Sequence, residues 1–191
     1  MTSEQQEAAE KAMLRNLLAT NFGFKAHQET KVELMYALVV DNAAKLKAFD
    51  GECPKLPANA PPPNPEKFDP NSEPPCGTGF VIPGQFRGSR VEIPSLLRFL
   101  SVYSGRVVQD KTGLKGRYDV NLKFTPDKSV LPPSPPLPPG MKLPEPDPNG
   151  PSLFDALVQQ VGLRLVPQTA PLEMVVVDDA VMPGQEAATG R

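Results

Sequence analysis

The chain has little of what most enzyme active sites need: it contains one histidine, two cysteines and no tryptophan. A Ser–His–Asp or Cys–His catalytic group requires a histidine, and His27 is the only candidate. It falls on the polar side of an alternating segment, between Lys25 and Glu29, which is typical of a solvated surface residue. One histidine and two distant cysteines also lack the ligand spacing of a zinc site. The sequence therefore predicts no enzyme activity, no metal site and no cofactor.

The chain also lacks an excess of charge and any long hydrophobic run. Its 20 basic and 22 acidic residues give a formal net charge of −2. A nucleic-acid binder needs a basic face to neutralise phosphates, so we expect no nucleic-acid partner. No stretch reaches the ~18 apolar residues of a membrane span. The N-terminal stretch has no apolar signal-peptide core, which indicates a cytoplasmic protein if the chain is complete as given.

Proline, in contrast, is abundant and clustered. Of 25 prolines, nine lie between Pro54 and Pro75 and eleven between Pro126 and Pro151. We therefore predict two proline-rich inserts, at residues 49–78 and 125–150. The second insert favours a polyproline II conformation, which would suit either a proline-binding partner or a stiff spacer. Cys53 and Cys76 flank the first insert, where they could form a disulfide or remain two free thiols.

Hydrophobic periodicity outlines the regular elements between these inserts. The expected helices start at Ser3, Pro94 and Ser152 and end near Gly23, Gly105 and Gly162. The expected strands are Phe24–Thr30, Leu34–Val40, 80–82, 86–92, Val107–Val108, Arg117–Phe124, Leu163–Val166 and Leu172–Val177. Two of these pairs, 24–40 and 163–177, would be hairpins, the second turning at Pro167–Pro171. A frayed tail is expected at residues 181–191.

The first and last blocks share one order of residue types. Residues 17–25 match 156–164 at a constant offset of 139, and after the expected turn the offset becomes 137. Either this is an internal repeat or two unrelated helix–hairpin units look alike. The repeat predicts an α+β fold with a complete strand–helix–strand–strand–helix–strand–strand module at 79–180. Residues 1–48 would then be an N-terminally truncated helix–strand–strand module, because one such unit cannot bury its faces alone.

The densest polar cluster lies in the middle of the chain. It comprises Asp110, Lys111, Thr112, Gly113, Leu114, Gly116, Arg117, Tyr118 and Asp119. Asp110, Arg117 and Asp119 could bind a charged ligand, but a turn held by local hydrogen bonds is the favoured interpretation. Asp178 and Asp179 are neighbours on an expected strand and point to opposite faces, so they make a poor acid–base pair.

Three stretches carry a resemblance to a known family. They are residues 13–40, residues 105–127 (GRVVQDKTGLKGRYDVNLKFTPD) and residues 150–183, and DKTGLKGRYD is the most specific piece. They resemble a large uncharacterised family of paralogues from soil Acidobacteria, a domain of unknown function. The element order is similar to the short N-terminal domain of secretins and TonB-dependent receptors, at the level of fold only.

The resemblance implies a periplasmic or secreted location, because members of that family usually begin with a signal peptide. Together with the missing catalytic residues, it leads us to expect a non-catalytic binding or protein-interaction module. Its exposed strand edges would pair with a protein partner not identified by the sequence. The alternative is a sensory accessory domain of a membrane metalloprotease or cell-wall signalling system, which would bind a small ligand. Related domains occur fused to such proteases.

Overall fold

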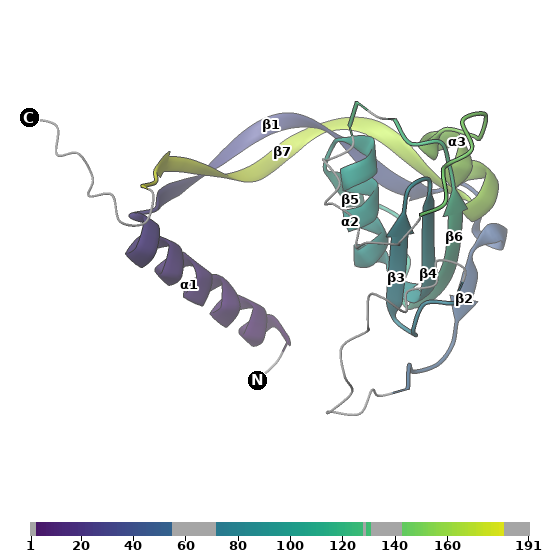
Figure 1. Ribbon diagram of the computed structural model, residues 1–191, viewed down its shortest axis with the longest axis horizontal. Helices are drawn as coiled ribbons and strands as arrows, with labels where there is room; N and C mark the ends of the chain where they lie inside the picture. Colours follow the sequence, from purple (N-terminus) through teal and green to yellow (C-terminus); the bar gives the residue numbers. More distant parts are fainter. Residues whose placement is uncertain (1–2, 55–71, 128, 131–142, 182–191) are drawn as a thin grey trace, which may run out of the picture. The chain divides into compact units, whose positions relative to one another are not determined.

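The computed structural model describes residues 3–54, 72–127, 129–130 and 143–181. Its helices are α1 (Ser3–Phe22), η1 (Ala43–Lys45), α2 (Ile93–Ser104), α3 (Leu153–Ala156) and η3 (Leu157–Val161). Its strands are β1 (Lys25–Val40), β2 (Lys47–Phe49), β3 (Thr78–Ile82), β4 (Gln85–Glu92), β5 (Val108–Asp110), β6 (Arg117–Lys123) and β7 (Leu163–Asp179). The mixture of helices with two sheets confirms the predicted α+β class (Figure 1).

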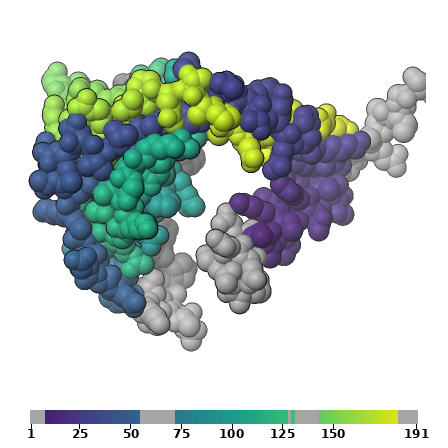
Figure 2. All heavy atoms as spheres, turned by 180° about the vertical axis from the view of Figure 1, so that it is seen from behind, coloured from purple at the N-terminus to yellow at the C-terminus, as the bar shows by residue number. Residues whose placement is uncertain are grey.

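The two expected hairpins do not form. Residues 25–40 make one continuous strand, β1, and residues 163–179 make another, β7. These long strands pair with each other and lie side by side in both views (Figures 1 and 2). The reason is local: neither Thr30–Glu33 nor Pro167–Pro171 contains a glycine or an Asn–Gly pair that would favour a tight hairpin turn. Prolines are tolerated in β7 because it is the outer strand of its sheet, among the described residues.

The described residues form two compact units. Unit 1 comprises Met1–Glu33 and Thr169–Arg191, and unit 2 comprises Leu34–Gln168. Both β1 and β7 contribute residues to each unit, so these units do not follow the domain boundaries expected at residues 48 and 79. The predicted proline-rich inserts lie mostly outside the described residues, as does the tail from residue 182.

Unit 2 contains a hydrophobic core between a four-stranded sheet and its helices. The sheet has the order β2-β6-β4-β3, and β5 pairs in parallel with β1 in the other sheet. In β6, Tyr118, Val120 and Leu122 are buried, and the residues between them are exposed or partly exposed. The same core takes in the buried sides of α2, α3 and η3, including Leu96, Leu100 and Leu157. The alternation of β6 therefore fixes which side of the sheet faces the helices.

The helix predictions are confirmed at their ends. Pro94 lies in the first turn of α2, and Gly105 ends that helix in the left-handed conformation. Ser152 caps α3 by accepting a hydrogen bond from Asp155 N, and η3 ends at Gly162, also left-handed. Glycine is favoured at such positions because it lacks a Cβ.

Candidate functional site

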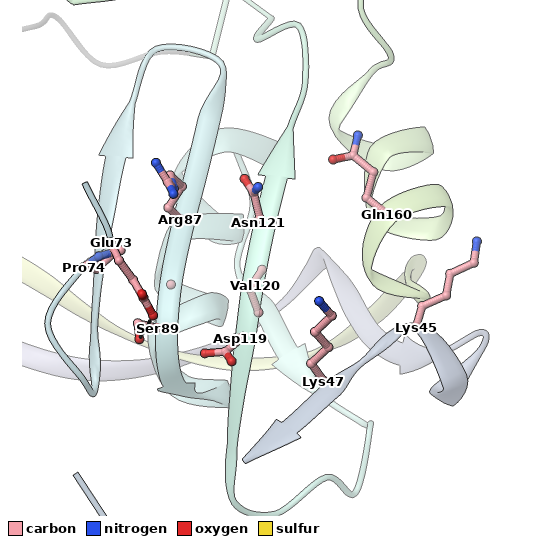
Figure 3. A pocket seen from close by; sticks show the side chains of 11 residues that line it. Lys45, Lys47, Glu73, Pro74, Arg87, Ser89, Asp119, Val120, Asn121 and Gln160 are labelled. Carbon is pink, nitrogen blue, oxygen red and sulfur yellow. Dashed lines mark hydrogen bonds between the residues drawn. The ribbon is translucent and has the colours of Figure 1, made fainter. Parts of the chain in front are cut away.

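The four-stranded sheet carries a polar pocket on the face opposite Tyr118 and Leu122, whose side chains lie in the hydrophobic core. The pocket has a volume of about 400 Å³. Its lining comes from β2, β4, β6, η1, η3 and the segment before β3: Lys45, Lys47, Glu73, Pro74, Arg87, Gly88, Ser89, Asp119, Val120, Asn121 and Gln160. Figure 3 shows Lys47 on β2, at one edge of the sheet, and Gln160 on the neighbouring η3. The lining of the pocket thus combines basic, acidic and amide side chains.

Hydrogen bonds hold several of these side chains in place. Ser89 is buried, and its Oγ donates to Glu73 Oε1 at 3.3 Å. Asn121 Oδ1 accepts from Gln85 Nε2 at 2.8 Å. Lys45 Nζ donates to the carbonyls of Val158 and Gln159, at 3.1 and 2.9 Å, near the end of η3. These contacts position polar groups that suit the binding of a small polar ligand.

A bulge in β4 forms the edge of the pocket. The register of β4 against β6 shifts between Gly88 and Val91. Within this bulge Arg90 has a positive φ of 53°, an uncommon conformation for a residue other than glycine. Asp119 Oδ1 accepts a hydrogen bond from Arg90 N at 2.9 Å, and so stabilises the bulge from β6. Asp119 therefore lines the pocket and also supports its backbone.

The other residues of the predicted polar cluster lie elsewhere and make local contacts. Asp110 Oδ1 accepts from Thr112 N and Thr112 Oγ1, at 2.8 and 2.7 Å. Thr112 Oγ1 accepts from Leu114 N at 3.1 Å, and Tyr118 Oη donates to Lys115 O at 2.9 Å. The backbone N–H of Lys111 donates to Leu38 O at 2.9 Å.

Gly113 and Gly116, also in this cluster, both have positive φ, and Arg117 pairs with Glu92 at 3.4 Å. The cluster thus forms the turn between β5 and β6, and Asp119 alone of its nine members lines the pocket.

Of the eleven residues that line the pocket, only Asp119 was predicted from the sequence. For Arg87, Ser89 and Asn121 the signal was present in the alternation of β4 and β6, because every second residue on a strand points to the same face. What the alternation could not reveal is which strands are neighbours. The pairing of β6 with both β2 and β4 brings the polar positions together.

Cys53 and Cys76 form a disulfide, with their Cα atoms 5.4 Å apart. The bond joins the segment after β2 to the segment before β3, next to Glu73 and Pro74 of the pocket lining. A cross-link that closes a loop of this length stabilises a protein by about 3 kcal/mol in the chain-entropy model.

The polar side chains of unit 1 pair across the strands. His27 Nδ1 lies 2.8 Å from Asp178 Oδ1, and Lys25 Nζ lies 3.5 Å from Asp179 Oδ2. In unit 2, Arg164 at the start of β7 pairs with Asp41 just after β1. All of these pairs are partly exposed, and such pairs each stabilise by about 1 kcal/mol or less. Asp178 therefore pairs with His27 rather than with a second carboxylate.

Unit 1 also exposes large apolar side chains. On α1, Leu14 is 58% and Leu17 53% exposed; on β7, Val175 is 60% and Val177 55% exposed. The end of α1 lies next to the end of β7, because Val181 N donates to Phe22 O at 2.8 Å. Exposed apolar side chains often mark an interaction surface. We call Leu14, Leu17, Val175 and Val177 the apolar surface of unit 1.

Within the described part of the chain, no three His, Cys, Asp or Glu side chains group in a way that could hold a metal ion. None of the described helices combines the length and apolar character needed to cross a membrane. No curated protein and no solved structure matches the chain. One family model does, over residues 1–180, and its description is "Protein of unknown function (DUF3738)". Because this match spans nearly the whole chain, the protein belongs to the DUF3738 family.

Proposed function

We propose that the chain is a non-catalytic protein-interaction module that works outside the cytoplasm. The apolar surface of unit 1 carries this proposal, because Leu14, Leu17, Val175 and Val177 are more than half exposed. Burial of the exposed part of each side chain gains about 1 kcal/mol, which can drive association when the four are summed. The Cys53–Cys76 disulfide supports the location, since such bonds persist mainly in oxidising compartments.

The outer edge of β7 offers backbone hydrogen-bonding groups to the same protein partner. Among the described residues, β7 is the last strand of its sheet, in the order β5-β1-β7. Its outward N–H and C=O groups can pair with an added strand. Tyr36 and Leu38 use such groups to pair with the chain around β5. Glu173 and Val175 are the β7 residues that match Tyr36 and Leu38 at the offset of 137.

Glu173→Pro tests this mode, because proline removes one outward N–H from the edge. Pro167 and Pro171 occupy β7 at the same alternation, so the strand accommodates proline on that side. We expect capture of protein partners from a periplasmic extract to fall at least about tenfold, the usual effect of losing a binding hydrogen bond and the adjacent strand contacts. Glu173→Asp, which keeps both the N–H and the negative charge, is the control and should bind as the unchanged chain does. Equal capture by both variants would contradict the proposal.

The polar pocket of unit 2 favours a second candidate function, a sensory domain that binds a small cell-wall fragment. Lys47, Ser89 and Asn121 offer donors and acceptors around a volume of about 400 Å³, which suits such a ligand. Muramyl dipeptide at about 100 times its dissociation constant would stabilise the chain by ~2.7 kcal/mol, measured as a rise in melting temperature. Asn121→Leu should lose that rise. An unchanged melting temperature at millimolar muramyl dipeptide would exclude this ligand for the pocket.

A further inference from the structure

We infer that the apolar surface of unit 1 binds a protein segment of strand–helix–strand–strand order, like the one that residues 85–123 (β4, α2, β5 and β6) form in this chain. The inference rests on the proposed interaction function and names the architecture of the partner. Its basis is the match between residues 14–25 and 153–164, at the offset of 139, and between 36–41 and 173–178, at 137. The partner segment would lie outside residues 1–191.

The matched positions differ in burial. On the helices, Leu14 is 58% exposed and its match Leu153 is 5% exposed; Leu17 is 53% exposed and its match Ala156 is fully buried. On the strands, Val175 is 60% exposed and its match Leu38 is fully buried. The matched positions are thus buried among apolar side chains in unit 2 and largely exposed to water in unit 1.

The helix ends and the strand starts are also similar in the two blocks. Gly23 and Gly162 both have positive φ, 54° and 74°, and each begins the connection from a helix to a long strand. Lys25 at the start of β1 pairs with Asp179, and Arg164 near the start of β7 pairs with Asp41. Each long strand therefore starts with a cation that pairs with an aspartate near the end of the other strand, although Asp179 lies one residue beyond Asp178, the match of Asp41.

In unit 2, the residues that cover the matched positions come from one continuous segment, from α2 to β6. They are Tyr118, Val120 and Leu122 of β6, with Leu96, Phe99 and Leu100 of α2, in the same core as Leu153 and Leu157. After α2 the chain forms β5, which pairs in parallel with β1 at Tyr36–Leu38. A partner with the same order would cover Leu14 and Leu17 with its helix and sheet. Its short strand after the helix would pair in parallel with β7 at Glu173–Val175.

Two observations restrict the kind of partner that fits this surface. The guanidinium of Arg106, just before β5, lies over the ring of Tyr36, 5.6 Å from its centre. The match of Tyr36 is Glu173, so a basic residue before the partner's short strand would form an ion pair there. A second copy of this chain does not suit, because its β6 and α2 already cover its own α3 and η3.

Photo-crosslinking in the cells that make the protein identifies the occupant. p-Benzoylphenylalanine replaces Leu17 or Val175 in the full chain, and Val102, exposed on α2, is the control position. We expect Leu17 and Val175 to crosslink to one partner, with Val175 joined to the short strand that follows its helix. Crosslinking at Leu17 should fall at least tenfold when Glu173→Pro is added, and Val102 should not join the same segment.

The other outcomes separate this inference from the proposed function. A crosslink to a protein of different architecture would overturn the inference and leave the interaction function standing. Crosslinks to residues 34–168 of the same chain, or to the same surface of a second copy, would overturn the inference as well. Absence of any crosslink to protein at both positions would contradict the inference and the proposed function together.

Discussion

Gly162→Ala is expected to destabilise unit 2 by roughly 4 kcal/mol, because among the described glycines this one has the closest backbone neighbour to an added Cβ. Gly162 has a φ of 74°, and a Cβ built there would fall on the carbonyl oxygen of Asn42. That oxygen belongs to the backbone and cannot turn aside as a side chain can. Its residue is also fixed by two hydrogen bonds, because Asp41 N and Asn42 N both donate to Gly162 O at 2.9 Å.

Three costs combine in this variant. A left-handed backbone costs alanine about 1–2 kcal/mol relative to glycine. Moving residues 41–42 away from the new methyl group weakens two backbone hydrogen bonds, each worth about 1 kcal/mol. The same movement displaces Asp41 from its ion pair with Arg164. Guanidinium chloride unfolding, followed by circular dichroism, measures the sum.

Gly23→Ala is the matched control for this prediction. Gly23 occupies the corresponding position in unit 1 with a φ of 54°, but its Cβ would meet only the side chain of Val181, at 3.2 Å. We therefore expect the conformational cost of about 1–2 kcal/mol and little more. If Gly162→Ala cost no more than Gly23→Ala, the close approach of Asn42 to η3 would be wrong.

The sequence predicted the local elements well because their causes are local. Pro94, Ser152 and the glycines at 105 and 162 act within one turn of a helix, so helix ends could be located from residue types alone. The alternation in residues 117–124 likewise predicted a strand, which the structure has as β6. These features depend on residues only a few positions apart.

Strand pairing was where the sequence failed. Residues 30–33 lack a glycine, which disfavours a tight hairpin turn, but the long strand also depends on its pairing with β7, about 140 residues away in the alignment of the two blocks. The pocket was missed for the same reason, because Lys47, Ser89 and Asn121 meet only once β2, β4 and β6 are neighbours. Periodicity describes one strand at a time and contains no information on its neighbours.

The exposed surface of unit 1 shows the opposite situation, in which sequence similarity is high and the environments differ. Leu14 and Leu153 are the same residue type at matched positions, 58% and 5% exposed. A sequence comparison alone would assign both to a core. The difference between them lies in the segment that covers one and does not cover the other, which only a structure can reveal.

Leu153→Ala is accordingly expected to destabilise unit 2 by roughly 3–4 kcal/mol, within the range for a buried leucine that leaves a cavity. Leu14→Ala removes the same atoms from the matched position and should change the free energy of unfolding by less than about 0.5 kcal/mol, because its side chain already contacts water. Guanidinium chloride unfolding of both variants provides the comparison. Equal losses would mean that Leu14 is buried in solution, and the apolar surface of unit 1 would then not be free for a partner.

The same pair of variants separates stability from binding once a partner is identified. Leu14 would be buried when the partner binds. Leu14→Ala should therefore weaken binding although it leaves the stability of the folded chain nearly unchanged. Truncation of a well-buried interface leucine costs about 1–2 kcal/mol, which weakens affinity roughly five- to thirtyfold. Isothermal titration calorimetry on the folded chain measures this loss. A Leu14→Ala chain that binds its partner with unchanged affinity would place that partner elsewhere on the molecule.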